Sequence, residues 1–148
     1  MNVLIHLLTS IVLSFILFPF FGYHSLWIIV GGFLIDFDHY LYYIFAFKSL
    51  NLKKAYVHCD NIDKRKIKVN DILHIFHTIE FWIFMIMVII LSYIYNVDFI
   101  FYMFLLTLIG IALHIILDFV HIARNFGYIC CGNRALSLIG WLKRRNLF

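Results

Sequence analysis

Residues 31–43 read GGFLIDFDHYLYY, which places Asp36, Asp38 and His39 inside an apolar stretch of the length that a membrane helix needs. On insertion scales, an Asp at the centre of a membrane helix costs about 3 kcal/mol. The surrounding Leu, Ile and Phe residues barely offset two such carboxylates. Ionisable residues at this depth therefore need compensating groups inside the membrane. The stretch predicts a membrane helix with polar partners on other helices.

The composition is that of a membrane protein. Of the 148 residues, 64% are apolar and 14% are charged, against about 25% charged in a typical soluble domain. Apolar stretches at residues 2–21, 25–47, 72–95 and 99–121 each approach the roughly 20 residues that span hydrocarbon. We predict an all-α polytopic membrane protein with a four-helix transmembrane bundle, forming one domain over residues 1–148.

The basic residues predict the orientation of these helices. All 12 Lys and Arg residues lie in the connection 48–70 or in the tail 122–148. The opposite connections, residues 22–24 and 96–98, contain neither Lys nor Arg. The positive-inside rule places basic connections in the cytoplasm. We therefore expect a multi-pass protein of the inner or plasma membrane, with a cytoplasmic loop at 48–70 and both termini in the cytoplasm.

The cytoplasmic segments indicate what the protein contacts. The loop 48–70 shows no lasting period of 2 or 3.6 residues, so it is predicted without a regular element. Residues 135–145, ALSLIGWLKRR, alternate apolar clusters with basic residues, as an interfacial amphipathic helix would. The basic residues adjoin membrane helices and form no readable nucleic-acid motif. Membrane lipids with anionic headgroups are thus the expected partner, rather than nucleic acid, and a homo-oligomer is left open.

The predicted topology brings the ionisable side chains of all four helices to one depth, the cytoplasmic half. They are His6 on the first helix; Asp36, Asp38 and His39 on the second; His74, His77 and Glu80 on the third; and His114, Asp118 and His121 on the fourth. Asp36 and Asp38 are two residues apart, so they point about 160° away from each other on a regular helix. One carboxylate could ligate while the other orients His39 or faces a second ion.

Imidazoles and carboxylates that converge from several helices suit a divalent metal ion such as zinc, manganese or iron. The predicted helices contain no Lys or Arg that could neutralise the carboxylates. A metal ion would supply this positive charge. Two alternatives remain: hydrogen bonds that hold the bundle together without a metal, and a metal carrier or sensor without catalysis.

The motif order resembles that of a known family. GGFLIDFDH is similar to the G-x-L-x-P-D-x-D-H segment of the YdjM-like membrane-bound metal-dependent hydrolases. That family also has an early His, a His-rich segment opening the third apolar stretch, and an H-x-x-x-D segment near the end. The matching residues are His6, then His74 with His77, then His114 with Asp118. The resemblance covers about residues 1–121, although Ile35 stands at the family's Pro and Glu80 has no counterpart.

The resemblance implies hydrolysis by metal-activated water, and the family is itself distantly similar to zinc-dependent phospholipase C and P1-type nucleases. The expected ligands are Asp36, His77, His114 and Asp118, with Asp38, His39, Glu80 and His6 for a second ion. Asp38 or Glu80 would act as general base. His74 and His121 would support the ligands by hydrogen bonds. A phosphoester of a lipid or amphiphile at the cytoplasmic leaflet is the expected substrate.

Overall fold

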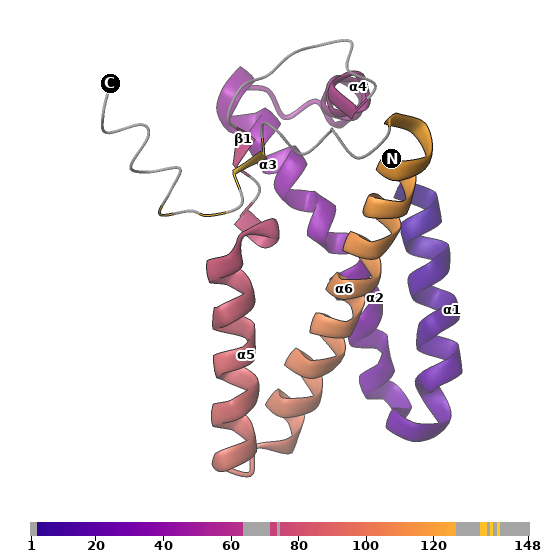
Figure 1. The fold of residues 1–148 in the computed structure, drawn as a ribbon, viewed down its shortest axis with the longest axis vertical. Helices are drawn as coiled ribbons and strands as arrows, with labels where there is room; N and C mark the ends of the chain where they lie inside the picture. The colour runs from indigo at the N-terminus through magenta and orange to yellow at the C-terminus, as the bar shows by residue number, and fades with distance from the viewer. Residues whose placement is uncertain are drawn as a thin grey trace. The chain divides into compact units, whose positions relative to one another are not determined.

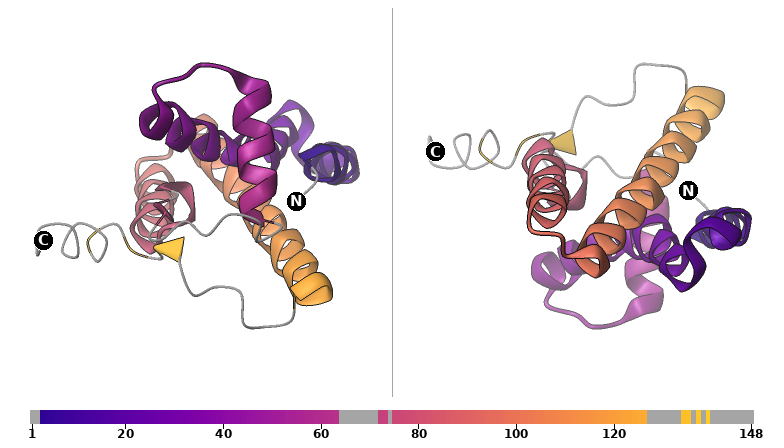
Figure 2. Two further views of the ribbon diagram at one scale, coloured as in Figure 1. Left: turned by 90° about the horizontal axis from the view of Figure 1, so that it is seen from above. Right: turned by 90° about the horizontal axis from the view of Figure 1, so that it is seen from below.

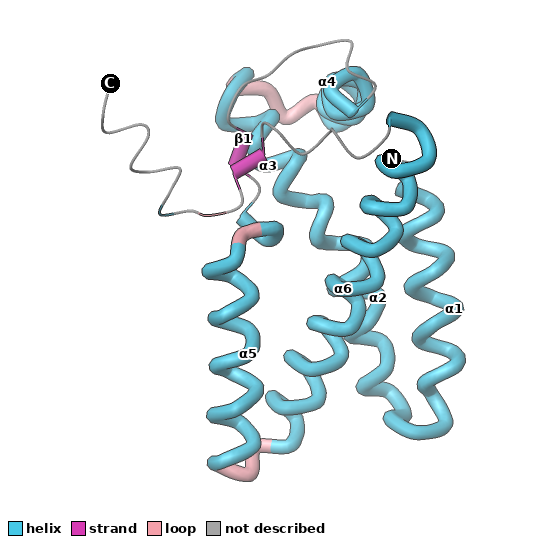
Figure 3. The backbone as a smooth tube through the Cα atoms, viewed as in Figure 1, coloured by secondary structure: helices cyan, strands magenta, loops and turns pink. Residues whose placement is uncertain are grey.

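The computed structural model describes residues 3–63, 72–73, 75–126, 134–135, 137 and 139. These residues are helical apart from short connections and one pair of two-residue strands (Figure 3). The all-α prediction is therefore confirmed for this part of the chain. The chain divides into two compact units. The long-helix unit comprises Asn2–Ile35 and Ile83–Asn125, and the short-helix unit comprises Asp36–Trp82 and Phe126–Phe148.

The long-helix unit begins with a helical hairpin. Helix α1 (Val3–Phe21) passes through the 3-10 turn η1 (Gly22–Leu26) into α2 (Trp27–Phe33), which packs against α1 (Figure 1). Gly22 has a φ of +54°, a conformation that glycine adopts at little cost, and it lies where the chain reverses. Most of α5 (Ile79–Ile94) and nearly all of α6 (Asp98–Phe126) complete this unit.

Helix α1 has a polar buried face and an apolar exposed face. Its buried residues are His6, Ser10 and Ser14, spaced four apart so that they share one side of the helix. By contrast, Phe15 and Phe20 are 75% and 79% exposed. A helix of a water-soluble bundle shows the opposite pattern, with apolar residues inside. The exposed apolar surface of α1 is what a lipid-facing helix presents.

Helices α2 and α6 approach each other closely because small residues face one another. A Cβ added to Gly31 would meet the carbonyl oxygen of Thr107, and one added to Gly110 would meet the carbonyl oxygen of Ile28. A Cβ on Gly32 would meet the hydroxyl of Ser10 on α1. Glycines at such contacts allow backbones to pack directly, which is a common way for membrane helices to associate.

Among the residues that the structure describes, two helical runs are long and apolar enough to cross a membrane, Val3–Phe47 and Asp98–His121. The first includes the hairpin and continues through η2 (Leu34–Asp36) into α3 (Phe37–Phe47). Helix α5 is apolar as well, but its 16 residues extend only about 24 Å at 1.5 Å per residue.

The short-helix unit is built on α3 and α4 (Leu52–Asp63), which contact each other and run crosswise (Figure 2). Lys48 ends α3 in the left-handed conformation, with a φ of 49°, and so redirects the chain. The unit also contains β1 (Ile72–Leu73), η3 (Ile75–His77) and the first turn of α5. Strand β1 pairs in parallel with β2 (Arg134–Ala135).

Helix α4 lies inside the segment that was predicted as a loop, and that prediction was incomplete. Asn51 caps the helix, since its side-chain oxygen accepts a hydrogen bond from the backbone N–H of Lys54 at 3.0 Å. Its apolar residues Leu52 and Tyr56 are exposed, whereas the small residue Ala55 is buried. The buried face thus carries too little hydrophobicity to produce a helical period in the sequence.

The bounds of three helices also differ from the predicted ones. The helix expected at 25–47 is interrupted by η2, so α2 and α3 are separate elements. The helix expected at 72–95 begins at Ile79, after β1 and η3. Helix α6 continues beyond the predicted end to Phe126. Ala135, the first residue of the expected amphipathic tail helix, lies in β2, while most of that tail is outside the described residues.

Candidate metal-binding clusters

The long-helix unit brings together His6, His114 and Asp118, which we call the long-helix cluster. His6 and His114 are 1% and 0% exposed, and their rings stack with centroids 3.9 Å apart at an interplanar angle of 20°. One oxygen of Asp118, Oδ1, lies 3.4 Å from Nε2 of His6. The other, Oδ2, lies 3.6 Å from Nε2 of His114. The carboxylate therefore faces both imidazoles.

Tetrahedral ligands at about 2.05 Å from zinc lie about 3.3 Å from one another. The contacts of Asp118 with the two imidazole nitrogens are of similar length, 3.4 and 3.6 Å, and each is made by a different carboxylate oxygen. The nearly parallel rings of His6 and His114 would need to splay for both lone pairs to point at one ion. The donor set, two imidazoles and one carboxylate, is one that zinc uses in catalytic sites.

A backbone contact sets the tautomer of His114. Its Nδ1 lies 2.9 Å from the carbonyl oxygen of Gly32 on α2. Because a carbonyl oxygen can only accept, Nδ1 carries the proton. In the neutral ring Nε2 then holds a lone pair, and it is this nitrogen that faces Asp118. A metal-ligating histidine commonly shows this arrangement, in which the other ring nitrogen donates to a backbone carbonyl.

The short-helix unit contains a second group, Asp36, Asp38, His39 and His77, which we call the short-helix cluster. Asp38 is 3% exposed and its two oxygens contact different imidazoles. Its Oδ1 lies 2.6 Å from Nδ1 of His39, and its Oδ2 lies 3.2 Å from Nδ1 of His77. The two rings are 5.7 Å apart, edge to face. Asp38 therefore joins α3 to η3 through His77, while His39 is its neighbour on α3.

This geometry separates the roles of the two neighbouring carboxylates. Each imidazole that donates from Nδ1 to Asp38 presents Nε2 as the atom able to ligate a metal or accept a proton. Asp36 is more exposed, and its Oδ1 is 3.8 Å from Nδ1 of His39. Asp38 thus orients two imidazoles, while Asp36 lies at the edge of the cluster.

Glu80 accepts hydrogen bonds from two residues that follow β2 in the chain. Its Oε1 accepts hydrogen bonds from Oγ of Ser137 at 2.5 Å and from the backbone N–H of Ile139 at 3.1 Å. Glu80 lies in the first turn of α5, so it holds the segment that follows β2. This contact gives the carboxylate a structural role, for which the sequence offered no signal.

The remaining predicted residues lie outside these contacts. His121 is on α6, three residues beyond Asp118, and is partly exposed. His74 falls outside the described residues. Of the four expected principal ligands, Asp36 and His77 belong to the short-helix unit, and His114 and Asp118 to the long-helix unit.

The described chain thus contains groups of His and Asp side chains that could hold a metal ion. No family model, curated protein or solved structure matches this chain. Its function is therefore inferred from the geometry of its own residues.

Two contributors to these clusters were not predicted from the sequence. The first is the carbonyl of Gly32, because a backbone acceptor has no signature in the residue type. The second is the pair Ser10 and Ser14, which form a row with the predicted His6 on one face of α1, as their i, i+4, i+8 spacing would have indicated. In that row Ser10 donates to the carbonyl of His6 at 2.6 Å and so fixes the backbone beside the imidazole.

Proposed function

We propose that this protein is a membrane-embedded, metal-dependent hydrolase that acts at the cytoplasmic leaflet on a phosphoester of a lipid or amphiphile. The observation that carries the proposal is the placement of Asp118 between Nε2 of His6 and Nε2 of His114. All three side chains project from helices of apolar sequence, and both imidazoles are buried.

The carboxylate of Asp118 is 17% exposed and faces two buried imidazoles. The sequence from Val3 to Phe47, and that of α6 before Arg124, contains no Lys or Arg. A divalent cation ligated by the two imidazoles and by Asp118 would neutralise the carboxylate. Zinc is the ion we favour, since it accepts nitrogen and carboxylate oxygen ligands in a four-coordinate site.

The exposed apolar surface of α1 supports a position of the protein in the membrane. We propose that α1, α2 with α3, α5, and α6 form four passes with both termini in the cytoplasm, as the distribution of basic residues suggests. Helix α5 is short for a pass, and a shorter apolar helix can be accommodated by local thinning of the bilayer.

The chain's own residues would position the ion and handle the proton. A divalent ion held by the long-helix cluster would lower the pKa of a water molecule toward about 7 and polarise a phosphoryl oxygen. In the short-helix unit, Asp38 holds His39 at 2.6 Å in the tautomer that presents Nε2. A carboxylate-oriented imidazole of this kind is a common general base. Within the short-helix cluster, His39 is therefore the residue best arranged to accept a proton, ahead of Asp38 and Glu80.

A metal carrier or sensor is the alternative function, and one observation favours it. Buried hydroxyls continue along α1 from His6 through Ser10 to Ser14, whose Oγ lies 3.3 Å from that of Ser25. A row of polar groups through an apolar bundle is what ion movement would require. However, Ser10 and Ser25 both donate to backbone carbonyls, of His6 and Gly22 respectively, which is a sufficient structural reason for their burial.

Metal content tests the proposal first. The full-length protein is expressed in metal-replete medium, purified in a mild detergent and analysed for bound metals by elemental analysis. We expect about one zinc or more per chain, and we expect Asp118→Ala and His114→Ala to lose it. Asp98→Ala is the matched control, because it removes a carboxylate from the first turn of the same helix.

Turnover then separates a hydrolase from a carrier or sensor. Phosphodiester, phosphomonoester and carboxylic ester substrates are presented in micelles, each with and without a chelator. Metal-dependent hydrolysis of a phosphoester that Asp118→Ala abolishes would support the enzyme. Stoichiometric metal without turnover on this panel would favour the carrier or sensor, and substoichiometric metal in the unaltered protein would overturn the metal site itself.

A further inference from the structure

The short-helix unit contains a pocket that none of the metal-binding residues line. It has a volume of about 540 Å³, within the range of about 300–1,000 Å³ that is typical of small-molecule sites. Its walls are formed by residues of α3, of α4 and of the connection between them, which follows Lys48. The lining residues are Tyr43, Phe47, Asn51, Lys53, Lys54, Val57, His58 and Asn61.

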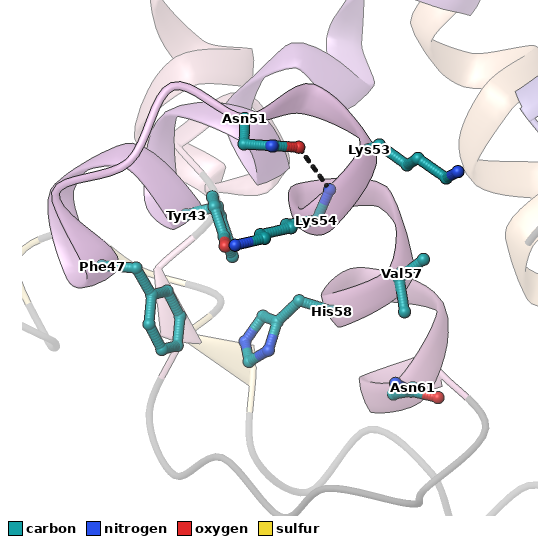
Figure 4. Close-up of a pocket in the computed structure, with 8 residues that line it drawn as sticks. All are labelled: Tyr43, Phe47, Asn51, Lys53, Lys54, Val57, His58 and Asn61. Carbon is teal, nitrogen blue, oxygen red and sulfur yellow. Dashed lines mark hydrogen bonds between the residues drawn. The ribbon is translucent and has the colours of Figure 1, made fainter.

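One wall of the pocket is aromatic. Tyr43 and Phe47 are four residues apart on α3 and their rings stack with centroids 4.8 Å apart. The ring of His58 on α4 lies 4.6 Å from that of Phe47, edge to face, and 5.6 Å from that of Tyr43. Figure 4 shows the rings of Phe47 and His58 next to each other. The three rings form a rigid floor on which an apolar or planar group can rest.

The other wall is basic and polar. Lys54, His58 and Asn61 follow one another at i, i+4 and i+7, so they share the face of α4 that borders the pocket. Nε2 of His58 is buried and has no hydrogen-bond partner among the residues that the structure describes. Figure 4 shows Lys54 pointing toward Tyr43, while Lys53 points away from the rings. None of the described lining residues is acidic.

We propose that this α3–α4 pocket binds the phosphate-bearing headgroup of an anionic amphiphile. The ammonium of Lys54 pairs with the phosphate, the amide of Asn61 and the imidazole of His58 add hydrogen bonds, and the Tyr43–Phe47 wall contacts the adjoining apolar part. A pocket with cationic donors on one side and aromatic rings on the other matches a ligand that is charged at one end and apolar at the other.

Neighbouring residues of α4 place this pocket at a membrane surface. Leu52, Tyr56 and Val57 are 66%, 52% and 50% exposed, so α4 presents apolar side chains to its surroundings as well as lysines. A short helix with this mixture lies in the interface between headgroups and acyl chains. Binding here requires neither a metal ion nor hydrolysis, so the inference stands apart from the proposed function.

Histidine ring signals of the isotopically labelled full-length protein, in uncharged detergent micelles with a chelator present, test the inference. Three probes are titrated: dioleoyl phosphatidic acid, dioleoylglycerol as its phosphate-free counterpart, and inorganic phosphate. We expect phosphatidic acid to shift the His58 signals saturably and dioleoylglycerol to leave them unchanged. A shift by inorganic phosphate as well would show that the phosphate suffices and that a soluble phosphate compound is the source; its absence would assign the ligand to lipid.

Neighbouring lysines provide the matched control. Lys54→Gln should weaken binding of phosphatidic acid about tenfold, as expected for loss of a charge-assisted hydrogen bond, and Lys54→Arg should restore much of it. Lys53→Gln removes the same charge one residue away and should change binding less than about twofold. Equal losses in the two variants would show general attraction to a basic surface and would overturn the pocket. So would an equal response to dioleoylglycerol, or no response of His58 to any probe.

Discussion

Nδ1 of His114 donates a hydrogen bond of 2.9 Å to the carbonyl oxygen of Gly32, and this bond links the chemistry of α6 to the packing of α2. The carbonyl fixes the tautomer that turns Nε2 toward Asp118. A glycine at position 32 avoids a clash with Ser10 of α1, which occupies the space that a Cβ would need. Helix packing in this unit therefore decides which nitrogen of His114 can ligate.

Two adjacent glycines should differ in their tolerance of alanine. A Cβ at residue 31 would meet the backbone carbonyl of Thr107, which cannot move without shifting α6, whereas one at residue 32 would chiefly meet the side chain of Ser10. Gly31→Ala should lower the free energy of unfolding by about 1–3 kcal/mol, and Gly32→Ala by less. Thermal unfolding in detergent measures both variants.

The double variants sharpen this comparison. Adding Ser10→Ala should restore stability to Gly32→Ala, since it removes the hydroxyl that the new methyl group meets. The same addition should not rescue Gly31→Ala. Rescue of both variants, or of neither, would contradict the described packing of α2 against its neighbours.

Zinc should stabilise the protein through Asp118. A ligand that binds the folded state alone, at a free concentration 100-fold above its Kd, adds about 2.7 kcal/mol to the free energy of unfolding. We expect zinc to raise the Tm and a chelator to reverse the increase. Asp118→Asn should remove the response, while Asp98→Asn should keep it. A zinc response that survives in Asp118→Asn would place the ion elsewhere.

Asp38→Asn should change the tautomer of one histidine in the short-helix cluster. A carboxylate can accept from both His39 and His77, but an amide offers one acceptor oxygen and one donor nitrogen. One of the two imidazoles must then accept at Nδ1 and carry its proton on Nε2. Nitrogen NMR of the histidine rings should show this change.

Asp36→Asn is the control for that experiment. Its oxygen Oδ1 is 3.8 Å from Nδ1 of His39, too far for a hydrogen bond, so the tautomer of His39 should stay as it is. If metal binds to this cluster, Asp38→Asn should weaken it about 10- to 100-fold. Unchanged histidine spectra in Asp38→Asn would mean that Asp38 does not set the tautomers.

Glu80→Ala should loosen the segment after β2. The carboxylate accepts the backbone N–H of Ile139, and loss of a hydrogen bond worth about 0.5–1.5 kcal/mol would speed hydrogen exchange at that amide about 2- to 12-fold. Glu80→Gln keeps an acceptor oxygen and should exchange more nearly as the unaltered protein does. No change in Glu80→Ala would make this residue a candidate for a chemical role again.

The helical class and the chemistry of the clusters could be predicted from the sequence because both depend on residue type. Long apolar stretches indicated helices, and Asp36 and Asp38, two apart, had to differ in direction. The structure shows the form of that difference, with Asp38 buried against two imidazoles and Asp36 at the edge. The four-pass topology and the resemblance to metal-dependent hydrolases stay predictions.

The remaining features depend on contacts that composition does not encode. Helix α4 was missed because its buried position is a small residue, Ala55, and its larger apolar residues are exposed. The hydrogen bonds that Glu80 accepts from Ser137 and Ile139, more than fifty residues later in the chain, were not predicted either. Such long-range partners follow from the folded arrangement and leave no local period.

The inverted polarity of α1 suggests how a water-soluble form could be engineered. Because His6, Ser10 and Ser14 already face inward, the interior contacts need no redesign to survive outside a bilayer. Replacing exposed side chains such as Phe15 and Phe20 with Glu, Lys or Gln would change only the outer surface of the helix. A soluble variant made in this way would keep the His6–Asp118 contact and open the cluster to direct metal titration without detergent.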